Sequence, residues 1–565
     1  MTVEFFITKS TGTHADPMAA VGLADLLEPM GNCTIEDRGQ EFAIQCRNDP
    51  AGQIDRLGQD PGYEYLVPNA KEPADACVPA ARILDYPQMR DAAVRYREAA
   101  KKAKKESSHA QREIIEAQAP RSDFYLYQTL NTLQGDGATN KAFVWVVKMT
   151  PAEWEQTLSG CLSGLARRVP IVPDVNLELD LVQLFNPQAA KGYARLKPDS
   201  TGRGDKTKDT WGQPFLEWLR FRGYFQAACT FGVGPKREHI RILYPIPKKI
   251  SRSALHQAAE SVRTSQIFGS NTKIDCLGVL RIAQFLISHG DEDGGPRRRP
   301  AQEIGGVSVT HYQSLGSAKA VTSIEELALP DWFENTTASQ RELWTNTLQE
   351  HFDRLRILRD ENSDELALLR TYRQSLEARG DASARRLFDF LEGYGVFVMR
   401  QRGQSKWYHR QFETAHLEAI VAQTSFSEIL ANPGFIAMAA ALRSATVSAQ
   451  FSKKMGRDHR DIRYDILPEL RRKRALPGKA AFAQALSEFV TSYNAESAKR
   501  LLEPKRQSGV KRITTDEWSS FLELLDRAEG GAGLVGSLLT AYATCRETRE
   551  PEEADPATET EEAQG

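Results

Sequence analysis

The stretch SQRELWTNTLQEHFDRL, from Ser339 to Leu355, decides how the second half of the chain is interpreted. Its large apolar residues recur at a spacing of three or four positions: Trp344, Leu348, Phe352 and Leu355. That spacing places them on one face of a helix. Ser339, followed by Glu342, has the pattern of a capping box. The stretch therefore predicts an amphipathic helix that begins near Ser339 and buries one side.

The same helical pattern recurs toward the C-terminus. Ser425 with Glu428 and Thr514 with Glu517 also have the capping-box pattern. An apolar stripe at helical spacing lies between these two pairs: Phe482, Ala485, Leu486, Phe489, Val490 and Tyr493. Successive amphipathic helices with short connections pack as a bundle. We therefore predict an all-helical bundle over residues 329–546.

The residues before this bundle mix strand-like and helix-like segments. Val3 to Thr8 (VEFFIT) predicts a short apolar strand, and Cys33 to Cys46 predicts a hairpin that turns at Arg38-Gly39. Further strands are predicted at Phe143 to Met149, Tyr224 to Val233 and His239 to Ile246. A helix-like stretch runs from Met89 to Ala117. The predicted fold class is therefore α+β, with a mixed α/β body at residues 1–328 and the helical bundle after it.

Two segments of the body have the composition of loops and combine glycine with clustered cations: residues 196–212 and 288–306. Their cations include Arg203, Lys206, Lys208, Arg297, Arg298 and Arg299. Glycine lets a backbone approach phosphate closely, so both loops are candidates for contact with a nucleic-acid duplex. The alternative is that they are surface insertions without a function. The segment from Gly269 to Lys273 is predicted to be a compact polar turn and adds Asn271 and Lys273 as candidates for contact with a base edge.

The strongest local feature is the segment from Phe451 to Lys479 (FSKKMGRDHRDIRYDILPELRRKRALPGK). Its candidate nucleic-acid-binding residues are Lys453, Lys454, Arg457, Arg460, Arg471, Arg472, Lys473 and Arg474. Several cations on one face bind a DNA or RNA backbone, because each phosphate that they neutralise releases counterions. The run from Arg471 to Arg474 has few anions near it in the sequence, which favours nucleic acid. The alternative is a solvated helix surface whose cations pair with nearby carboxylates.

The formal charge of the chain is unevenly distributed, although its sum is only −2. The segment from Arg443 to Arg512 carries roughly twice as many basic as acidic residues. Residues 547–565 form an acidic tail that contains proline and alanine, and this composition predicts disorder. The near-neutral sum therefore does not argue against a nucleic-acid-binding protein.

Other kinds of chemistry have weaker support in the sequence. Asp458, Asp461 and Asp465 would form a metal-dependent nuclease site if they shared one side of a helix, but the interleaved arginines disfavour a metal there. The sequence has no phosphate-binding loop, nucleophile elbow or zinc-binding helix motif, so we expect no catalysis and no cofactor. A second alternative is a helical interaction scaffold whose basic face binds an acidic protein partner.

The cysteines and the hydropathy indicate the compartment. The seven cysteines are scattered and form no CxxC pair, as in cytoplasmic proteins with free thiols. No apolar run reaches the roughly 18 residues that span a bilayer, and the N-terminus lacks the pattern of a signal peptide. We expect a soluble, cytoplasmic protein with no membrane partner.

Three regions resemble the large subunit of type I CRISPR surveillance complexes, which are called Cascade. In the first, the strand VEFFIT leads to a Thr-Gly turn, then to Asp16-Pro17 and a helix of small residues that reaches Gly22. The second, from His311 to Phe333, resembles the family's connection into its helical half. The third, from Pro433 to Tyr493, contains ALRSAT, IRYDILPELRRKR and FVTSYN and resembles helices equivalent to the small subunit of the complex.

The resemblance implies a non-catalytic, DNA-binding subunit of an RNA-guided antiviral complex. Such a subunit recognises the protospacer-adjacent motif, helps to open the duplex and holds the displaced strand. The implied partners are the guide-RNA complex with its backbone and small subunits, the target double-stranded DNA, the displaced single strand and a recruited helicase-nuclease. The basic face around Arg471 to Arg474 would then follow the displaced strand of the R-loop, and the loops of the body would contact the duplex.

Overall fold

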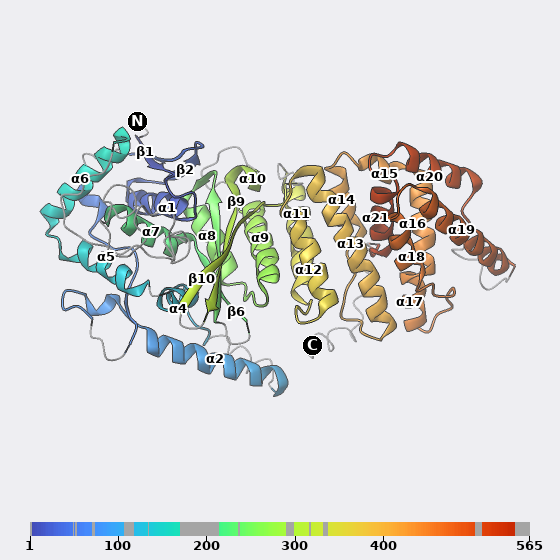
Figure 1. Ribbon diagram of the computed structural model, residues 1–565, viewed down its shortest axis with the longest axis horizontal. Helices are drawn as coiled ribbons and strands as arrows, with labels where there is room; N and C mark the ends of the chain where they lie inside the picture. The colour runs from blue at the N-terminus through green and yellow to red at the C-terminus, as the bar shows by residue number, and fades with distance from the viewer. Residues whose placement is uncertain are drawn as a thin grey trace. The chain divides into compact units, whose positions relative to one another are not determined.

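The computed structural model describes residues 3–48, 50, 53–69, 74–106, 118–133, 135–169, 214–234, 238–289, 299–315, 318–331, 337–502 and 511–547 (Figure 1). The chain divides into two compact units, Met1–Leu329 and Pro330–Gly565. This boundary lies one residue from the predicted one. Strands and helices alternate in the first unit, whereas every element assigned among the described residues of the second is a helix. The predicted α+β fold class is therefore confirmed.

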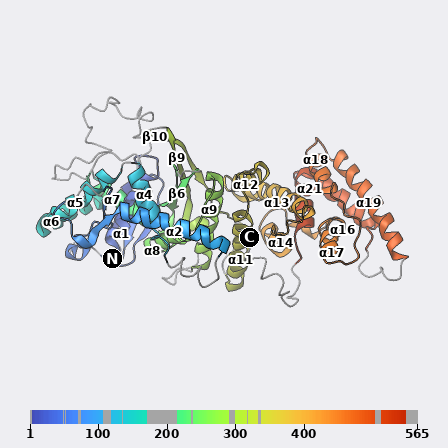
Figure 2. The same cartoon turned by 90° about the horizontal axis from the view of Figure 1, so that it is seen from below.

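The described residues of the N-terminal unit form three sheets (Figures 1 and 2). One antiparallel sheet has the order β1-β3-β2-β8, a second has the order β10-β9-β7-β6, and β4 pairs with β5 in parallel. The strands are β1 (Val3–Thr8), β2 (Thr34–Asp37), β3 (Glu41–Cys46), β4 (Tyr65–Val67), β5 (Ile83–Asp85), β6 (Cys229–Val233), β7 (His239–Pro247), β8 (Lys249–Ser251), β9 (Ile304–Leu315) and β10 (Ala318–Leu327). The predictions of the first strand, of the hairpin and of the strand at His239 are confirmed.

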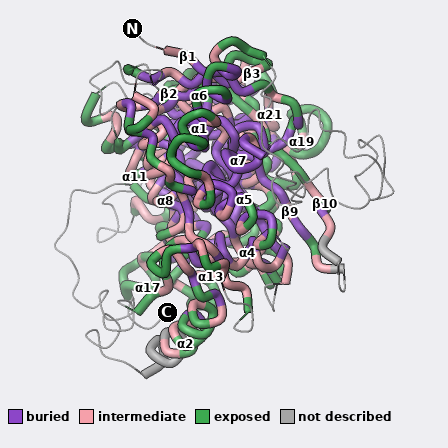
Figure 3. The backbone as a smooth tube through the Cα atoms, turned by 90° about the vertical axis from the view of Figure 1, so that its left-hand side faces the viewer, coloured by how far each residue is buried: buried purple, intermediate pink, exposed green. Residues whose placement is uncertain are grey.

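Two helices of this unit touch through their backbones. The helices are α1 (Ala15–Leu27), α2 (Tyr86–Glu106), α4 (Phe124–Thr132), α5 (Asp136–Lys148), α6 (Pro151–Arg167), α7 (Pro214–Ala227), α8 (Arg252–Arg263), α9 (Asn271–Ser288) and α10 (Pro300–Glu303), with 3-10 turns at Glu28–Met30, Ile54–Leu57 and Ala80–Arg82. A Cβ atom at Gly22 of α1 would lie 1.8 Å from the backbone oxygen of Leu219 in α7. Every residue of α1 is buried (Figure 3). The α1–α7 contact is thus the centre of the unit, and it requires glycine at the crossing.

Two strand predictions are wrong. Phe143 to Met149 lies mostly in α5, and Tyr224 to Val233 is divided between the end of α7 and β6. Aromatic and β-branched residues favour strands locally, which explains both predictions. In α5, however, the buried residues repeat at helical spacing: Ala138, Thr139, Ala142, Phe143, Trp145 and Val146. The contacts that these side chains make in the core therefore outweigh the local preference for a strand.

The structure describes only the two ends of the predicted loop at residues 288–306, and both ends include residues of helices or strands. α9 ends at Ser288, α10 begins at Pro300, and β9 begins at Ile304. Residues 290–298 lie outside the described residues, as does the whole predicted loop at 196–212. β9 and β10 form a long antiparallel pair that the sequence analysis does not predict.

The C-terminal unit is a bundle in which α13 is central. Its helices are α11 (Ala338–Arg356), α12 (Ser363–Ser375), α13 (Gly380–Gly403), α14 (Thr414–Ala422), α15 (Ser427–Ala431), α16 (Pro433–Ala445), α17 (Val447–Lys454), α18 (Ile466–Arg474), α19 (Ala480–Leu501), α20 (Thr515–Arg527) and α21 (Gly531–Thr544). α13 contacts α12, α17, α18 and α21. Residue Gly395 lets α13 approach α21 closely, because a Cβ atom there would lie 2.1 Å from the hydroxyl oxygen of Thr544.

The helix starts in this unit were only partly predictable from capping patterns. α20 begins with the predicted capping box of Thr514 and Glu517. α11 begins two residues early, with Thr337 and Gln340 as its capping box. Ser425 does not cap α15, because its hydroxyl bonds to Asp381 instead. The predicted apolar stripes are confirmed: Trp344, Leu348, Phe352 and Leu355 of α11 are buried, as are Phe482, Leu486, Phe489 and Tyr493 of α19.

Candidate nucleic-acid interface

The basic segment at residues 451–479 is not one continuous helix. It comprises the end of α17, a non-helical connection over residues 455–465, α18, and the turn before α19. Asp458 and Asp461 lie in the connection, and Asp465 is the residue before α18. The three carboxylates therefore do not share one side of a helix, and the geometry assumed for a nuclease site is wrong. Within the described part of the chain, no three His, Cys, Asp or Glu side chains form a group that could hold a metal ion.

α18 has two faces with different roles. Leu467 and Leu470 are buried, and Arg471 and Arg474 follow them at helical spacing on the same side. Arg472 lies on the opposite side, which faces away from the buried leucines, and Lys473 lies at the flank of the helix, where it is half-buried. Arg474 is thus turned toward the fold and Arg472 away from it, whereas Arg471 is 49% exposed at the other flank.

Arg474 is part of the fold. Its Nε donates to Glu392 of α13 at 2.8 Å, and a terminal nitrogen donates to Asp389 at 2.8 Å. The Glu392 side chain is fully buried, and Arg471 lies 3.6 Å from it. Burial raises the pKa of Glu392, and the hydrogen bonds from Arg474 oppose that shift. The expectation that this cation run has few anions nearby is therefore wrong, because α13 supplies them.

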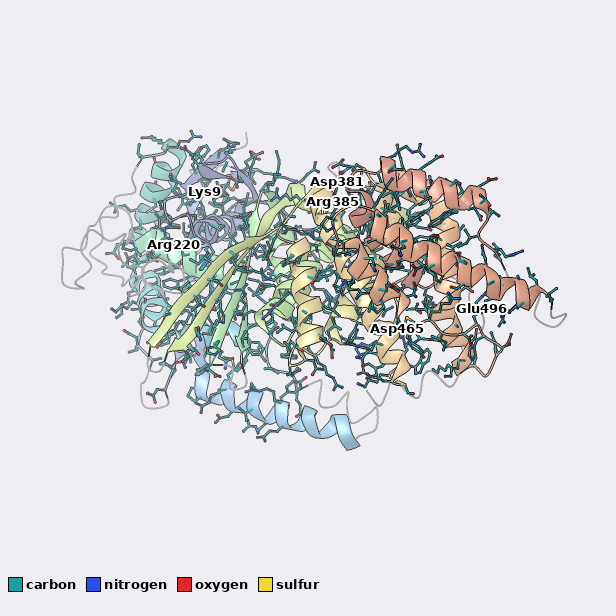
Figure 4. The ribbon with its side chains drawn as sticks, turned by 45° about the vertical axis from the view of Figure 1, so that its right-hand side comes forward. Lys9, Arg220, Asp381, Arg385, Asp465 and Glu496 are labelled. Atoms are coloured by element: carbon teal, nitrogen blue, oxygen red, sulfur yellow. The ribbon has the colours of Figure 1, made fainter. Side chains whose placement is uncertain are left out.

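Arg460 is a second cation that the fold uses internally. Its side chain is 6% exposed, donates to the hydroxyl of Ser497 at 2.9 Å and lies 3.4 Å from Glu496. Arg463 also pairs with Glu496, which projects from α19 and is labelled in Figure 4. These arginines hold the connection at residues 455–465 against α19. The interpretation of Arg460 as a nucleic-acid contact is corrected accordingly, since a buried, paired guanidinium does not reach phosphate.

The remaining candidate cations of the segment stay available at the surface. Lys453, Arg457 and Arg472 are exposed and Lys473 is half-buried, and none of them pairs with a carboxylate in the described part of the chain. Lys454 is also exposed, and its ammonium lies 4.8 Å from the ring centre of Trp407. We call these five residues the free cations of the helical unit. They are the cations of the segment that can contact a ligand, because the fold does not use them in ion pairs.

The predicted residues of the N-terminal unit are less informative. Arg203, Lys206, Lys208, Arg297 and Arg298 lie outside the described residues. Arg299 is exposed directly before α10, and its backbone N–H donates to Gln302.

The segment at Gly269 to Lys273 is not the compact turn that was expected. Ser270 is the N-cap of α9, and its hydroxyl accepts from the backbone N–H of Lys273. Asn271 and Lys273 therefore lie in the first helical turn, partly covered by the unit. The correction follows from the capping chemistry, because a serine directly before the first residue of a helix is a favoured N-cap.

A polar pocket of about 340 Å³ in the N-terminal unit has no signal in the sequence. It is lined by residues distant in the chain, among them Arg82, Arg121, Arg263 and His256. Its arginines are paired with carboxylates, as in the contacts of Arg82 with Asp60 and of Arg263 with Glu260. Burial lowers the pKa of His256, which favours its neutral form. The pocket therefore lacks the excess positive charge that a nucleic-acid backbone requires.

Residues that the sequence analysis missed lie next to the free cations. The segment KWYHR, from Lys406 to Arg410, follows α13, and its Trp407 ring lies under Lys454 and within 5.1 Å of the Arg402 guanidinium. Cations that alternate with aromatic residues are a known signature of single-strand binding surfaces. This alternation is the sequence pattern that could have identified these residues. Only the fold shows that they lie next to the basic segment.

Comparisons with known proteins add no family to this description. No protein-family model matches the chain, and no curated protein matches it either. None of the helices in the described ranges is both long enough and apolar enough to cross a membrane.

Proposed function

We propose that the chain is a non-catalytic nucleic-acid-binding subunit whose helical unit grips the backbone of a single strand. The observation that supports this most directly is the set of free cations, Lys453, Lys454, Arg457, Arg472 and Lys473, which no carboxylate of the described fold neutralises. Each phosphate that such a cation contacts releases counterions and adds affinity without reading sequence.

The fold keeps these cations in place. Arg474 ties α18 to α13, and Arg460 ties the preceding connection to α19. Because the anchoring arginines share short segments with the free cations, the free cations project from backbone that is fixed by buried ion pairs. A phosphate contact made from rigid backbone loses less conformational entropy on binding than one made from a flexible tail.

The finer form of the proposal places the chain in an RNA-guided complex. It is the large subunit of a type I CRISPR effector in the cytoplasm, where the N-terminal unit recognises the protospacer-adjacent motif and helps to open the target duplex. Its partners are the guide-RNA complex with its backbone and small subunits, and a recruited helicase-nuclease. The support is the resemblance at residues 433–493, together with the division of the chain into a mixed unit and a helical unit.

The test uses the full chain and a single-stranded DNA oligonucleotide over a range of salt concentrations. Replacing Arg472 and Lys473 with alanine should weaken binding for every sequence and reduce the salt slope by roughly 1.4, or about 0.7 for each lost phosphate contact. A charge-matched control replaces Arg356 and Arg370, which are exposed on α11 and α12. The control should change neither the affinity nor the slope.

Equal losses in the two variants would contradict the proposal, because they would show a general charge effect. Binding of an acidic protein that competes with DNA, with no salt-dependent DNA affinity of its own, would favour the scaffold alternative instead. Co-purification of the chain with a small RNA and backbone subunits tests the finer form separately. Recovery of the chain alone from its native cells would contradict that form. It would not contradict the proposed binding of a single-strand backbone.

A further inference from the structure

Aromatic side chains are exposed beside the free cations. Phe451 on α17 is 49% exposed, Tyr464 in the connection before α18 is 43% exposed, and Tyr408 after α13 is 51% exposed. Rings of this size are normally covered in a folded protein, and exposed apolar groups that cluster mark a surface for a ligand. We call Trp407, Tyr408, Phe451 and Tyr464 the aromatic patch.

The fold brings the patch together from three segments of the chain. Tyr464 lies against Gly403 at the end of α13, where an added Cβ atom would come within 3.1 Å of the ring. Trp407 lies under the ammonium of Lys454 at 4.8 Å. Phe451 is one turn before Lys454 on α17, so the two share a side of that helix. The patch therefore lies where α17 and the connection before α18 meet the C-terminal end of α13 (Figure 1).

A side-chain hydrogen bond anchors α17 in this position. The amide of Gln450, which is buried, donates to the backbone oxygen of Met399 in α13 at 2.9 Å. Phe451 follows Gln450 directly and points to solvent. The exposed ring is thus mounted on a helix whose inner face is fixed, which is what a stacking platform requires.

The charges around the patch favour a polyanion. Lys406, Lys453 and Arg457 are exposed beside it and pair with no described carboxylate. Of the nearby acidic residues, Asp458 is bound by Arg500, and Asp461 and Asp465 are exposed. Asp465 is labelled in Figure 4. With Lys454 included, four cations stand against two available carboxylates, so the surface is net positive.

We propose that the aromatic patch stacks unpaired bases of a single strand whose phosphates the free cations hold. The inference rests on the proposed function and adds to it the way in which the bases are bound. A π face is available on every unpaired base, whereas the bases of a duplex are stacked on one another and offer only their edges. The patch therefore gives a preference for single strands over duplex and no preference for sequence.

The test measures binding of the full chain to an oligonucleotide of about 20 nucleotides that carries 2-aminopurine, and to the duplex of the same sequence. Replacing Phe451 or Tyr464 with leucine keeps the apolar volume and removes the π face. Each change should lower single-strand affinity by about tenfold and leave duplex affinity and the salt slope unaltered. The quenching of 2-aminopurine on binding should decrease in parallel.

Conservative and distant variants control for folding. Phe451→Tyr and Tyr464→Phe keep an aromatic ring and should retain single-strand affinity and quenching. Phe268→Leu removes a ring that is 50% exposed in the N-terminal unit and should have no effect. If the leucine variants lose duplex binding as well, or if the conservative variants also fail, the loss is a folding defect and the stacking inference is overturned.

The outcome also separates this inference from the proposed function. Unchanged single-strand affinity in both leucine variants, with a clear loss when Arg472 and Lys473 are replaced, would overturn stacking while the backbone grip stands. Absence of DNA binding by the unaltered chain would overturn both. A loss confined to single strands, with an unaltered salt slope, supports stacking and cannot come from phosphate contacts alone.

Discussion

One ion pair in each unit shows a difference in how far its arginine is buried. In the N-terminal unit, Arg241 of β7 and Asp275 of α9 form two hydrogen bonds of 2.6 to 2.8 Å, and both side chains are buried. In the helical unit, the Glu392 carboxylate is equally buried, but its partner Arg474 is 15% exposed. The Arg241–Asp275 pair is thus enclosed whole, whereas the Arg474–Glu392 pair has an enclosed anion and a cation at the edge of its unit.

This difference shows why a run of cations is hard to interpret from sequence. An arginine at the edge of a bundle looks like a surface residue, although it neutralises a buried carboxylate. Its neighbours Arg472 and Lys473 look identical and neutralise nothing among the described residues. Arg474 therefore contributes to stability, whereas Arg472 and Lys473 are the residues for which we propose binding, and the two roles can be separated by substitution.

The largest expected effect comes from breaking the buried ion pair of Arg241 and Asp275. Arg241→Ala removes both guanidinium hydrogen bonds from the buried Asp275 and should lower the free energy of unfolding of the N-terminal unit by about 4 kcal/mol. Hydrogen exchange with mass spectrometry at increasing denaturant reports each unit separately. Arg38→Ala is the control, because Arg38 and Glu4 form an ion pair at the surface, and it should cost less than about 1 kcal/mol. Similar losses in the two variants would show that burial of the pair is unimportant.

A smaller effect comes from a histidine that is buried in the helical unit in its neutral form. Burial lowers the pKa of His351 from 6.5 to about 4, and its Nδ1 lies 3.0 Å from the hydroxyl of Tyr372. As pH falls from 6.5 to 4, the unfolded chain takes up this proton before the folded chain does. The helical unit should therefore lose up to about 3 kcal/mol over that range, and nothing from this group above it.

His351→Gln tests this by removing the titrating group and keeping an amide for hydrogen bonding. Unfolding of the helical unit, followed at several pH values, should depend less steeply on pH between 6.5 and 4 in the variant. His409 contributes in the same direction, because burial lowers its pKa to about 4 as well. An identical pH dependence in the variant and the unaltered chain would show that His351 is protonated without cost.

The smallest expected effect is a difference in stability between two variants of α18. Arg474→Ala should destabilise the helical unit by about 2 kcal/mol, because Glu392 loses its hydrogen bonds from Arg474 while Arg471 remains near it. Arg472→Ala, on the opposite side of the same helix, should change stability by less than about 0.5 kcal/mol. The binding experiment should rank the two variants by their loss of salt slope, with Arg472→Ala losing a full phosphate contact. Equal stability losses would contradict the division of α18 into two faces.

Part of the fold follows from local patterns alone. The β2–β3 hairpin has a turn at Arg38-Gly39 between two short strand-like segments, and α19 has an apolar stripe at helical spacing, so both were predicted correctly. The second half of α5 was predicted as a strand because the aromatic and β-branched residues from Phe143 onward favour one locally, whereas its packing against the core requires a helix. β9 and β10 were both missed. One partner of β9 is β7, which lies about sixty residues earlier, so that pairing has no local signal. The other is β10, which directly follows β9 in the chain.

The sequence by itself determined that the chain changes from a mixed fold to a helical one near residue 329, because helical periodicity is a property of neighbouring residues. It also located the cations of residues 451–479. Only the tertiary structure decided which of them are available. Arg474 meets a carboxylate 82 residues earlier in the chain, on α13, and Arg460 meets a hydroxyl 37 residues later, on α19. Such partners are set by how helices pack, so helical spacing can assign Arg474 to the inner side of α18 but cannot identify the carboxylate that it meets.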